Sequence, residues 1–200
     1  MMKRESPRKT PRDTPVSRTP LIGKREFDAV FTRWLSKIRQ ALTSEGGEGK
    51  WALVGIKRRG ALLAQRMWKD LNQQDSPLLY GEVDISLYRD DYHLQKEKPQ
   101  VLGTEILFRV DGVKILLVDD VLYTGRTVRA AMDLILDFGR PRVISLAVFV
   151  DRGHRELPIA ANFVGKEIET ERQDLVQVKL SEMGEEDGVE LIHRRQEPAE

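Results

Sequence analysis

The segment at residues 113–127 constrains the fold of this chain more than any other. It begins with the apolar run Val-Lys-Ile-Leu-Leu-Val, continues with Asp-Asp-Val-Leu-Tyr, and ends in a Thr-Gly-Arg-Thr turn. The run has the length of a buried β-strand, and apolar residues then recur at helical spacing over 128–138. A second apolar run follows at 143–150. A strand, a helix and a strand in this order form a βαβ unit with a parallel sheet and a right-handed crossover, so we predict an α/β protein.

The rest of the chain supplies further elements of the same class. Apolar periodicity predicts helices over 27–42 and 61–71, and an apolar run predicts a buried strand at 51–56. Residues 78–87 alternate as a strand does, 88–110 form a long polar loop, and two shorter strand candidates lie at 161–165 and 175–180. The 200 residues show no internal repeat and have the size of one domain with tails.

Composition excludes several classes of protein. The chain has no cysteine, which rules out disulfides and thiolate zinc sites and indicates a reducing, cytoplasmic setting. No apolar run approaches the roughly 18 residues of a membrane span, and the N-terminus lacks the apolar core of a signal peptide. Because 33 basic residues nearly balance 32 acidic ones, a uniformly basic nucleic-acid coat is excluded, although a local basic patch is not.

The near-neutral charge is a sum that includes two opposed tails. Residues 1–20 carry six basic and two acidic side chains together with four prolines, and we expect a flexible basic arm there. Residues 181–200 carry seven acidic and two basic side chains, and we expect an acidic C-terminal tail, part of which could form an edge strand. The folded domain is predicted between them, over residues 21–180.

We predict the chemistry at the junction of strand and helix. Ligands of parallel α/β sheets bind at the carboxyl ends of strands, and the first N–H groups of a helix attract anions. Gly125 lets the backbone approach a phosphate, and the hydroxyls of Thr124 and Thr127 can donate to it. Asp119 and Asp120 are anions themselves and suit sugar hydroxyls better. We therefore interpret 119–127 as a ribose 5-phosphate site; the alternative is that these side chains only cap the helix.

Four segments together carry a resemblance to a known family. They are residues 54–60, 81–91, 118–129 and 150–159. The third resembles the motif with which type I phosphoribosyltransferases bind 5-phosphoribosyl 1-pyrophosphate (PRPP). The second and fourth are similar to segments of the PyrR family, bifunctional pyrimidine operon attenuators with uracil phosphoribosyltransferase activity. The resemblance spans residues 24–192 and implies the type I phosphoribosyltransferase fold, with a parallel-sheet core, flanking helices and a small hood.

The resemblance implies a reaction, in which uracil and PRPP give UMP and pyrophosphate with Mg²⁺ that PRPP mainly carries. Donors and the metal must absorb the charge that develops on the pyrophosphate, so we expect positioning and charge stabilisation rather than a side-chain base. The implied catalytic residues are Arg89, Asp119 and Asp120. The implied substrate-binding residues are Lys57, Arg58, Arg59 and Gly60 (the pyrophosphate loop, 57–60), Asp119, Asp120, Tyr123, and Thr124, Gly125, Arg126 and Thr127 (the phosphate turn, 124–127).

The hood, residues 150–155, is implied to hold the base. Its candidate base-binding residues are Val150, Asp151, Arg152 and His154. Arg152 could stack on the base or hydrogen-bond to it, whereas a hydrogen-bonded structural role is favoured for His154. Specificity for a purine base stays open, because the PRPP motif is shared across bases.

Family members also bind a hairpin of pyrimidine-operon leader mRNA, favoured by UMP, through a face of the dimer. Thr32, Arg33, Arg155 and Lys166 match residues of that face, and a homodimer or higher homo-oligomer is implied. Ser36, Ala41 and Ala160 depart from it, standing where a histidine and two arginines are expected. Because each lost phosphate contact weakens RNA binding, two alternatives stay open. One is a transferase without an RNA role, and the other is an attenuator with weak transferase activity.

Overall fold

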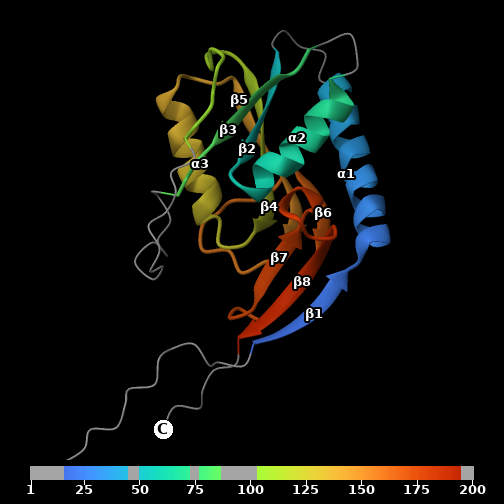
Figure 1. Cartoon of the computed structure of the whole chain (residues 1–200). Helices are drawn as coiled ribbons and strands as arrows, with labels where there is room; N and C mark the ends of the chain where they lie inside the picture. Colours follow the sequence, from blue (N-terminus) through green and yellow to red (C-terminus); the bar gives the residue numbers. More distant parts are fainter. Residues whose placement is uncertain (1–15, 45–49, 73–76, 87–102, 195–200) are drawn as a thin grey trace, which may run out of the picture.

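The computed structural model describes residues 16–44, 50–72, 77–86 and 103–194. Its centre is a five-stranded parallel sheet in the order β3-β2-β4-β5-β6 (Figure 1). The sheet confirms the predicted α/β class with a parallel core. Its strands are β2 (Trp51–Ile56), β3 (Leu79–Val83), β4 (Lys114–Leu122), β5 (Val143–Asp151) and β6 (Phe163–Glu167).

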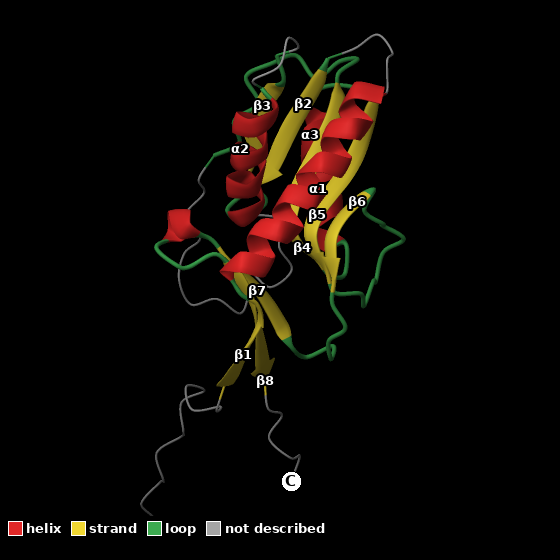
Figure 2. Cartoon of the chain, turned by 90° about the vertical axis from the view of Figure 1, so that its right-hand side faces the viewer, coloured by secondary structure: helices red, strands yellow, loops and turns green. Residues whose placement is uncertain are grey.

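Three helices cover the two faces of this sheet. The helices α1 (Lys24–Ser44) and α2 (Arg59–Leu71) lie on one face, and α3 (Arg126–Asp137) lies on the other (Figures 1 and 2). Successive residues of a strand point to opposite faces. Leu116 of β4 therefore packs in the cluster that contains α1 and α2 residues, and Leu117 packs with α3. Both faces of the sheet are apolar, which explains the nearly continuous apolar runs in the strand sequences.

The middle strand, β4, brings the expected functional segments together. Val118 of β4 lies opposite Gly55 of β2, and Asp119 lies opposite Val148 of β5. Because the strands are parallel, the segments that follow β2, β4 and β5 leave the sheet at the same edge. These segments are the pyrophosphate loop, the phosphate turn and the hood.

A second, smaller sheet unites the two ends of the described chain. It is antiparallel in the order β1-β8-β7, and we call it the small sheet. Its side chains Ile22, Val178 and Val189 complete the core on the α1–α2 face of the large sheet. Its strands are β1 (Val16–Ile22), β7 (Leu175–Lys179) and β8 (Gly188–Arg194), with the 3-10 turn η2 (Ser181–Met183) between β7 and β8.

The small sheet corrects the predicted tails. The flexible arm predicted for residues 1–20 is wrong for 16–20, which pair with β8; Thr19, for example, lies opposite Leu191. Likewise, β8 is the central strand of its sheet rather than an edge strand within an acidic tail. Local sequence patterns could not show this pairing, because its partners lie at opposite ends of the chain. Residues 1–15 and 195–200 lie outside the described residues.

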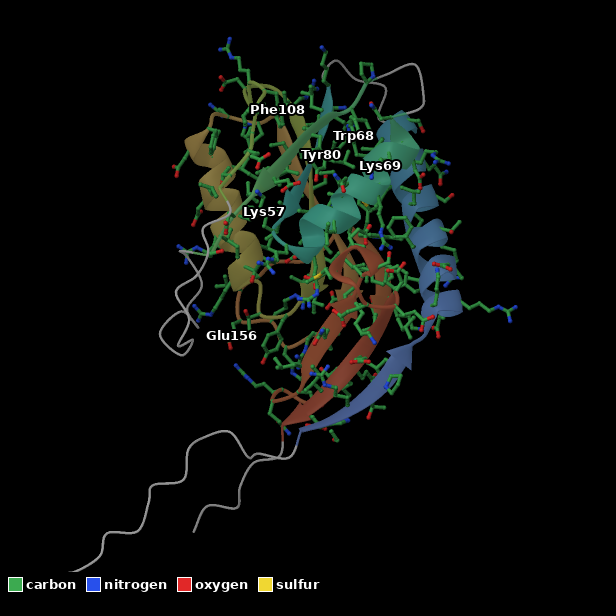
Figure 3. The ribbon with its side chains drawn as sticks, in the orientation of Figure 1. Lys57, Trp68, Lys69, Tyr80, Phe108 and Glu156 are labelled. Atoms are coloured by element: carbon green, nitrogen blue, oxygen red, sulfur yellow. The ribbon has the colours of Figure 1, made fainter. Side chains whose placement is uncertain are left out.

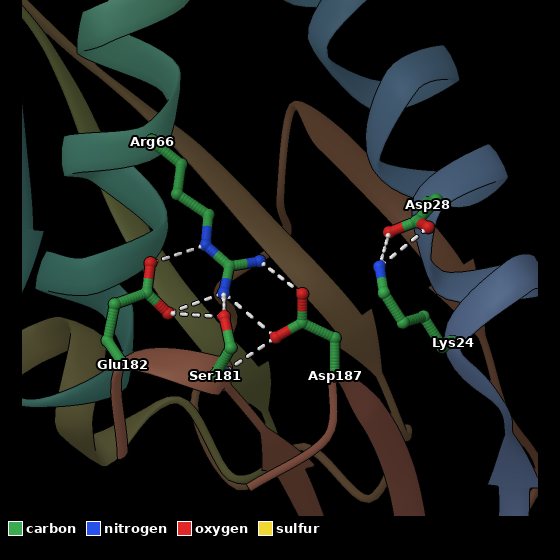
Figure 4. A network of polar contacts seen from close by, with 6 residues as sticks. All are labelled: Lys24, Asp28, Arg66, Ser181, Glu182 and Asp187. Carbon is green, nitrogen blue, oxygen red and sulfur yellow. Dashed lines mark hydrogen bonds and ion pairs between the residues drawn. The ribbon is translucent and has the colours of Figure 1, made fainter. Parts of the chain in front are cut away.

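A cluster of charged side chains joins the small sheet to α2, and we call it the Arg66 cluster (Figure 4). Arg66 donates to both oxygens of Asp187, at 2.8 and 3.0 Å, to Glu182 Oε1 at 2.7 Å and to Ser181 Oγ at 3.0 Å. The N–H of Ser181 also donates to Asp187 Oδ1 at 2.7 Å. Lys24 and Asp28 form a separate pair on α1 in the same figure. Glu182 and Asp187, two acidic residues of the expected tail, therefore have a structural role.

The remaining predicted elements are confirmed with shifted ends. The helix predicted from residue 27 begins at Lys24, and the strand candidate at 161–165 is β6. The strand predicted to end at residue 118 continues to Leu122. Of the predicted loop 88–110, residues 88–102 lie outside the described residues, and Glu105 forms an antiparallel bridge with Glu82. In the ranges that the structure describes, no helix is long and apolar enough to cross a membrane.

Candidate active site

The two predicted aspartates lie within β4, near its carboxyl end. Asp119 is 5% exposed, and its Oδ1 accepts a hydrogen bond of 2.9 Å from the N–H of Asp120. Burial raises the pKa of Asp120, while the positive charge of Arg59 acts in the opposite direction. The cost of burying this ionised carboxylate without full solvation falls when a ligand supplies hydroxyl donors.

The pyrophosphate loop packs directly against this part of β4. A Cβ on Gly60 would lie 2.6 Å from the carbonyl oxygen of Val118 and 2.9 Å from Cα of Asp119, closer than any side chain can approach. Only glycine therefore lets the loop come this close to the aspartates. The structure thus brings the pyrophosphate loop and the aspartate pair together, as predicted.

Lys57 is held by polar groups of β3 and of residues 103–105. Its ammonium donates to the carbonyl of Gly103 at 2.8 Å and lies 3.3 Å from carboxylate oxygens of both Glu82 and Glu105. Its side chain is 9% exposed. Lys57 therefore fastens the loop to β3 and to the segment at 103–105, and its contact with a pyrophosphate stays a prediction. Figure 3 shows Lys57 beside the start of α2.

The pyrophosphate loop also borders a cavity. Arg58 is exposed, and the peptide bond between Lys57 and Arg58 is cis. A cavity of about 480 Å³ opens between this loop, the start of α2 and η2. Its lining residues are Lys57, Arg58, Ala61, Leu62, Glu82, Glu182 and Met183.

The phosphate turn has the geometry of an anion site. Gly125 caps the N-terminus of α3 with φ of 92°, a left-handed conformation that favours glycine. Because Gly125 has no side chain, the cap residue does not occupy the first N–H groups of the helix. Thr124 Oγ1 accepts a hydrogen bond of 3.3 Å from the N–H of Arg126, and Thr127 follows in the first turn of α3.

The hood is tied to the loop at residues 168–174, which leads into β7. Arg152 is 3% exposed and donates to the carbonyls of Asp174 and Glu171, and its guanidinium lies 4.2 Å from the centre of the Tyr123 ring. Burial lowers the pKa of Arg152. One face of the Arg152 guanidinium therefore lies over Tyr123, and the role of Arg152 in stacking on the base or hydrogen-bonding to it stays a prediction.

The other hood residues are also engaged. His154 forms a hydrogen bond of 2.7 Å between Nε2 and the carbonyl of Thr170, which matches the structural role favoured from the sequence. Asp151 accepts from the N–H of Gly153 at 2.9 Å and pairs with Arg155. Val150 is fully buried in β5. The hood thus offers a ligand mainly its backbone and its shape.

The structure separates the four candidate RNA residues. Arg155 donates to the carbonyls of Tyr123, Gly153 and Ile159 and pairs with Asp151, so its charge is committed inside the hood. Thr32 and Arg33 are exposed on α1, and Lys166 of β6 pairs with Glu26 of α1. Lys166 is thus paired with the helix that carries Thr32 and Arg33, whereas Arg155 is engaged within the hood; the RNA roles of all four stay predictions.

Several polar atoms in these segments lack a partner. Among the described residues, the buried side-chain atoms without a hydrogen bond include Nε of Arg59, Nε of Arg152 and Oγ1 of Thr170. Buried donors without partners are rare in folded proteins, and each one costs free energy. Their presence in the pyrophosphate loop, the hood and the 168–174 loop is consistent with a site that a ligand completes.

Sequence reasoning missed the partners that hold the site in place. Glu82 and Glu105 bind Lys57, while Glu156 binds both Arg126, at 2.9 Å, and Arg172. No local pattern marks these contacts, although Glu82 and Glu156 lie inside segments that carry the family resemblance. Arg89, predicted to be catalytic, lies outside the described residues.

Comparison with known proteins adds two kinds of similarity. The profile of the phosphoribosyl transferase domain matches residues 24–182. A protein named Bifunctional protein PyrR from Listeria monocytogenes serotype 4b (strain CLIP80459) is 46% identical over 176 residues, which cover 84% of this chain and 95% of that protein. A protein of the same name from Bacillus mycoides (strain KBAB4) is 46% identical over 171 residues, with the same coverage.

Solved structures share the fold at low identity. A hypoxanthine phosphoribosyltransferase from Trypanosoma cruzi has a TM-score of 0.62 at 17% identity and covers 80% of this chain and 84% of its own. One from Staphylococcus aureus has a TM-score of 0.58 at 19% identity, with coverage of 79% and 80%. These similarities concern the arrangement of the sheet and helices.

Proposed function

The chain belongs to the phosphoribosyl transferase domain family and, within it, to the PyrR family, and on that basis we propose that it transfers the phosphoribosyl group of PRPP to uracil. The products are UMP and pyrophosphate. One observation carries the proposal: Asp119, Asp120 and the phosphate turn lie together at the carboxyl end of β4. Carboxylates that accept from hydroxyls beside a helix start that binds phosphate match ribose 5-phosphate.

Each segment has a separate task in this reaction. The phosphate turn binds the 5-phosphate, and the carboxylates of Asp119 and Asp120 accept hydrogen bonds from the ribose hydroxyls. Arg58, Arg59 and Gly60 stabilise the charge that develops on the leaving pyrophosphate. Lys57 holds this loop against β3 through Glu82. Catalysis then rests on positioning and charge stabilisation rather than on a side-chain base.

We propose that Mg²⁺ enters with PRPP. Across the described ranges, no three His, Cys, Asp or Glu side chains are grouped so that they could hold a metal ion. No side chain is assigned as a direct ligand of the ion, since Asp119 and Asp120 are engaged by the ribose hydroxyls and Mg²⁺ readily keeps substrate phosphates and water around it. When bound, the ion neutralises charge on the pyrophosphate.

A direct assay tests the proposal. The full chain is incubated with uracil, PRPP and Mg²⁺, and UMP is measured against a reaction without uracil. Formation of UMP supports the proposal, and its absence refutes it. Parallel reactions with hypoxanthine and guanine test the purine alternative, which a faster purine reaction would favour.

A second function rests on a different observation. Thr32 and Arg33 of α1 and Lys166 of β6 place polar and basic side chains on one edge of the molecule, where they can contact RNA phosphates. We propose that this edge, in a homodimer or higher homo-oligomer in the cytoplasm, binds pyrimidine-operon leader mRNA when UMP is present. Ser36, Ala41 and Ala160 reduce the number of contacts. A gel shift with the organism's own leader, with and without UMP, tests this; no UMP-dependent shift at moderate salt refutes it.

A further inference from the structure

One side-chain cluster joins Arg126 of the phosphate turn to Glu156 and Arg172, which have no role in the proposed reaction. The carboxylate of Glu156 accepts from Arg126 Nε through Oε2 at 2.9 Å and from Arg172 through Oε1 at 2.5 Å. Arg126 begins α3, Glu156 follows the hood, and Arg172 belongs to the 168–174 loop. We call these three residues the arginine fork. Two guanidinium groups from different segments therefore converge on one carboxylate.

Backbone contacts fix the fork next to the turn. The N–H of Glu156 donates to the carbonyl of Thr124 at 3.0 Å, and the hydroxyl of Tyr123 donates to the carbonyl of Arg172 at 2.9 Å. Glu156 and Arg172 are thus each anchored to a residue in the turn or directly before it. Figure 3 shows Glu156 near the end of α3 that faces the small sheet.

The ion pairs of the fork are exposed enough for another anion to replace the carboxylate of Glu156. The side chains of Arg126, Glu156 and Arg172 are 54%, 29% and 66% exposed, and exposed pairs contribute little to stability. A phosphate carries nearly two negative charges at neutral pH and matches the planar guanidinium with two hydrogen bonds. Such a group is a better partner for two arginines than one carboxylate is.

We infer that, in the free protein, the carboxylate of Glu156 occupies the position between Arg126 and Arg172 that the substrate phosphate takes when it binds. On this inference, which rests on the proposed phosphate site, Arg172 is a positioning residue for the phosphate, and Glu156 is its intramolecular competitor. When the phosphate binds, the Glu156 side chain turns to solvent, and Arg172 follows the phosphate with the 168–174 loop. Arg152 of the hood donates to two carbonyls of that loop. Movement of the loop on phosphate binding therefore also changes the position of the hood that holds the base.

Opposite effects of two neutral substitutions test the fork. Binding of ribose 5-phosphate, a probe without a base, is measured by calorimetry for the full chain and its variants at low and moderate salt. Glu156→Gln removes the competitor and is expected to tighten binding by about 2–5-fold, and Arg172→Gln is expected to weaken it by about 3–10-fold. Arg172→Lys keeps the charge but not the paired hydrogen bonds and should recover only part of the affinity. Higher salt should reduce all these differences.

Arg129 and Asp133 provide a matched control. They form an exposed ion pair on α3, with side chains 66% and 61% exposed, outside the fork. Arg129→Gln and Asp133→Asn should each leave the affinity unchanged within a factor of about two. If the fork only braces the structure, Glu156→Gln and Arg172→Gln both weaken binding, and the inference is overturned. It is also overturned if neither changes the affinity.

The same variants separate this inference from the proposed transferase activity. UMP formation by the unaltered chain, with both substitutions shifting affinity in the same direction, rejects the fork and leaves the activity standing. Opposite shifts for ribose 5-phosphate without any UMP formation reject the activity and support the fork as an anion site. In the active enzyme, Arg172→Gln should raise KM for PRPP while kcat stays close to its original value.

Discussion

The large parallel sheet and the small sheet differ in the contacts that hold each of them in the fold. The parallel sheet is packed on both faces, and residues such as Leu53, Leu116 and Phe149 are completely buried. The small sheet contributes fewer apolar residues and is joined to α2 through the Arg66 cluster. Apolar packing is nearly independent of pH, whereas a charged cluster depends on the protonation of every member. The small sheet is therefore the part that acid or a single substitution should loosen first.

The two sheets also support different parts of the candidate active site. The aspartates and the phosphate turn follow from β4 of the parallel sheet, whereas Arg152 of the hood is anchored to carbonyls of residues 171 and 174, just before β7. Binding of ribose phosphate should thus depend on the parallel sheet, and binding of the base should depend on the small sheet as well. Variants in each sheet can separate the two.

The largest expected effect lies in the parallel sheet. Asp120→Asn removes a carboxylate that accepts from ribose, and we expect kcat/KM to fall by about 5- to 1,000-fold, equivalent to roughly 1–4 kcal/mol. The melting temperature should stay the same or rise, because burial raises the pKa of Asp120 and its ionised form is costly in the folded state. Steady-state kinetics and thermal unfolding check both statements, with Asp133→Asn as the control. Unchanged kinetics would contradict the ribose role.

The next effect lies at the joint between the sheets. Arg66→Met leaves Glu182 and Asp187 without their cation, and Asp187 is only 9% exposed at its side chain. Because the cluster is partly exposed, we expect a loss of about 2–4 kcal/mol, below the upper range for fully buried pairs. The melting temperature should fall by about 4–16 °C in Arg66→Met. In Arg129→Met, which breaks an exposed pair, the melting temperature should change by less than about 4 °C. Equal shifts for the two variants would show that the cluster does not hold the joint.

The stability that the Arg66 cluster contributes should depend on pH. The hydrogen bonds from Arg66 lower the pKa of Glu182; burial alone would raise the pKa of Asp187, but bonds from Arg66 and the Ser181 N–H hold it low. A lowered pKa contributes stability that is present above the ordinary values of 4.5 and 3.8 and is lost as the pH falls through the folded-state values. The difference in melting temperature between the unaltered chain and Arg66→Met should therefore be largest near neutral pH and shrink below about pH 4. A difference that is constant with pH would exclude these carboxylates as its source.

The contrast between the sheets also explains what could be predicted from the sequence. Strands β2, β4 and β5 are apolar runs with helices between them, so local pattern and the right-handed crossover rule define their arrangement. The phosphate turn is contiguous and equally visible. The small sheet pairs residues 16–22 with 188–194, which lie at opposite ends of the sequence. The basic and acidic ends of the chain meet only after folding, so residues 16–20 looked like an arm and β8 like part of an acidic tail. Long-range pairing has no local signature.

The same limit applies to individual side chains. The sequence places Lys57 and Arg155 in basic segments near the site, but whether a cation faces a ligand depends on carboxylates and carbonyls that fold next to it. Glu105 comes from a segment predicted as loop, and the carbonyl partners of Arg155 carry no residue-specific signal. Positions of charged groups could be predicted, and their partners could not.

A smaller effect distinguishes the two cations at the start of the pyrophosphate loop. Lys57→Met leaves Glu82 and Glu105 without their shared cation, and we expect a stability loss of about 1–3 kcal/mol together with a higher KM for PRPP. Arg58→Met should raise that KM with little change in melting temperature, because Arg58 is exposed. Kinetics and thermal unfolding of both variants provide the comparison. Equal stability losses would show that Lys57 does not anchor the loop to β3.

The smallest effect concerns the edge where α1 meets β6. Arg33 and Lys166 would each contribute one phosphate contact, so Arg33→Ala or Lys166→Ala should weaken leader-RNA binding modestly and lower the salt slope by about 0.7–0.9 units. Arg155→Ala should act differently, because Arg155 ties the hood to the carbonyl of Tyr123 and is not available to RNA. It should impair UMP binding, and weaken RNA binding only where UMP is required. Gel shifts at several salt concentrations, with and without UMP, measure both effects. If Arg155→Ala lowers the salt slope as Arg33→Ala does, Arg155 contacts RNA directly and belongs to the RNA-binding surface.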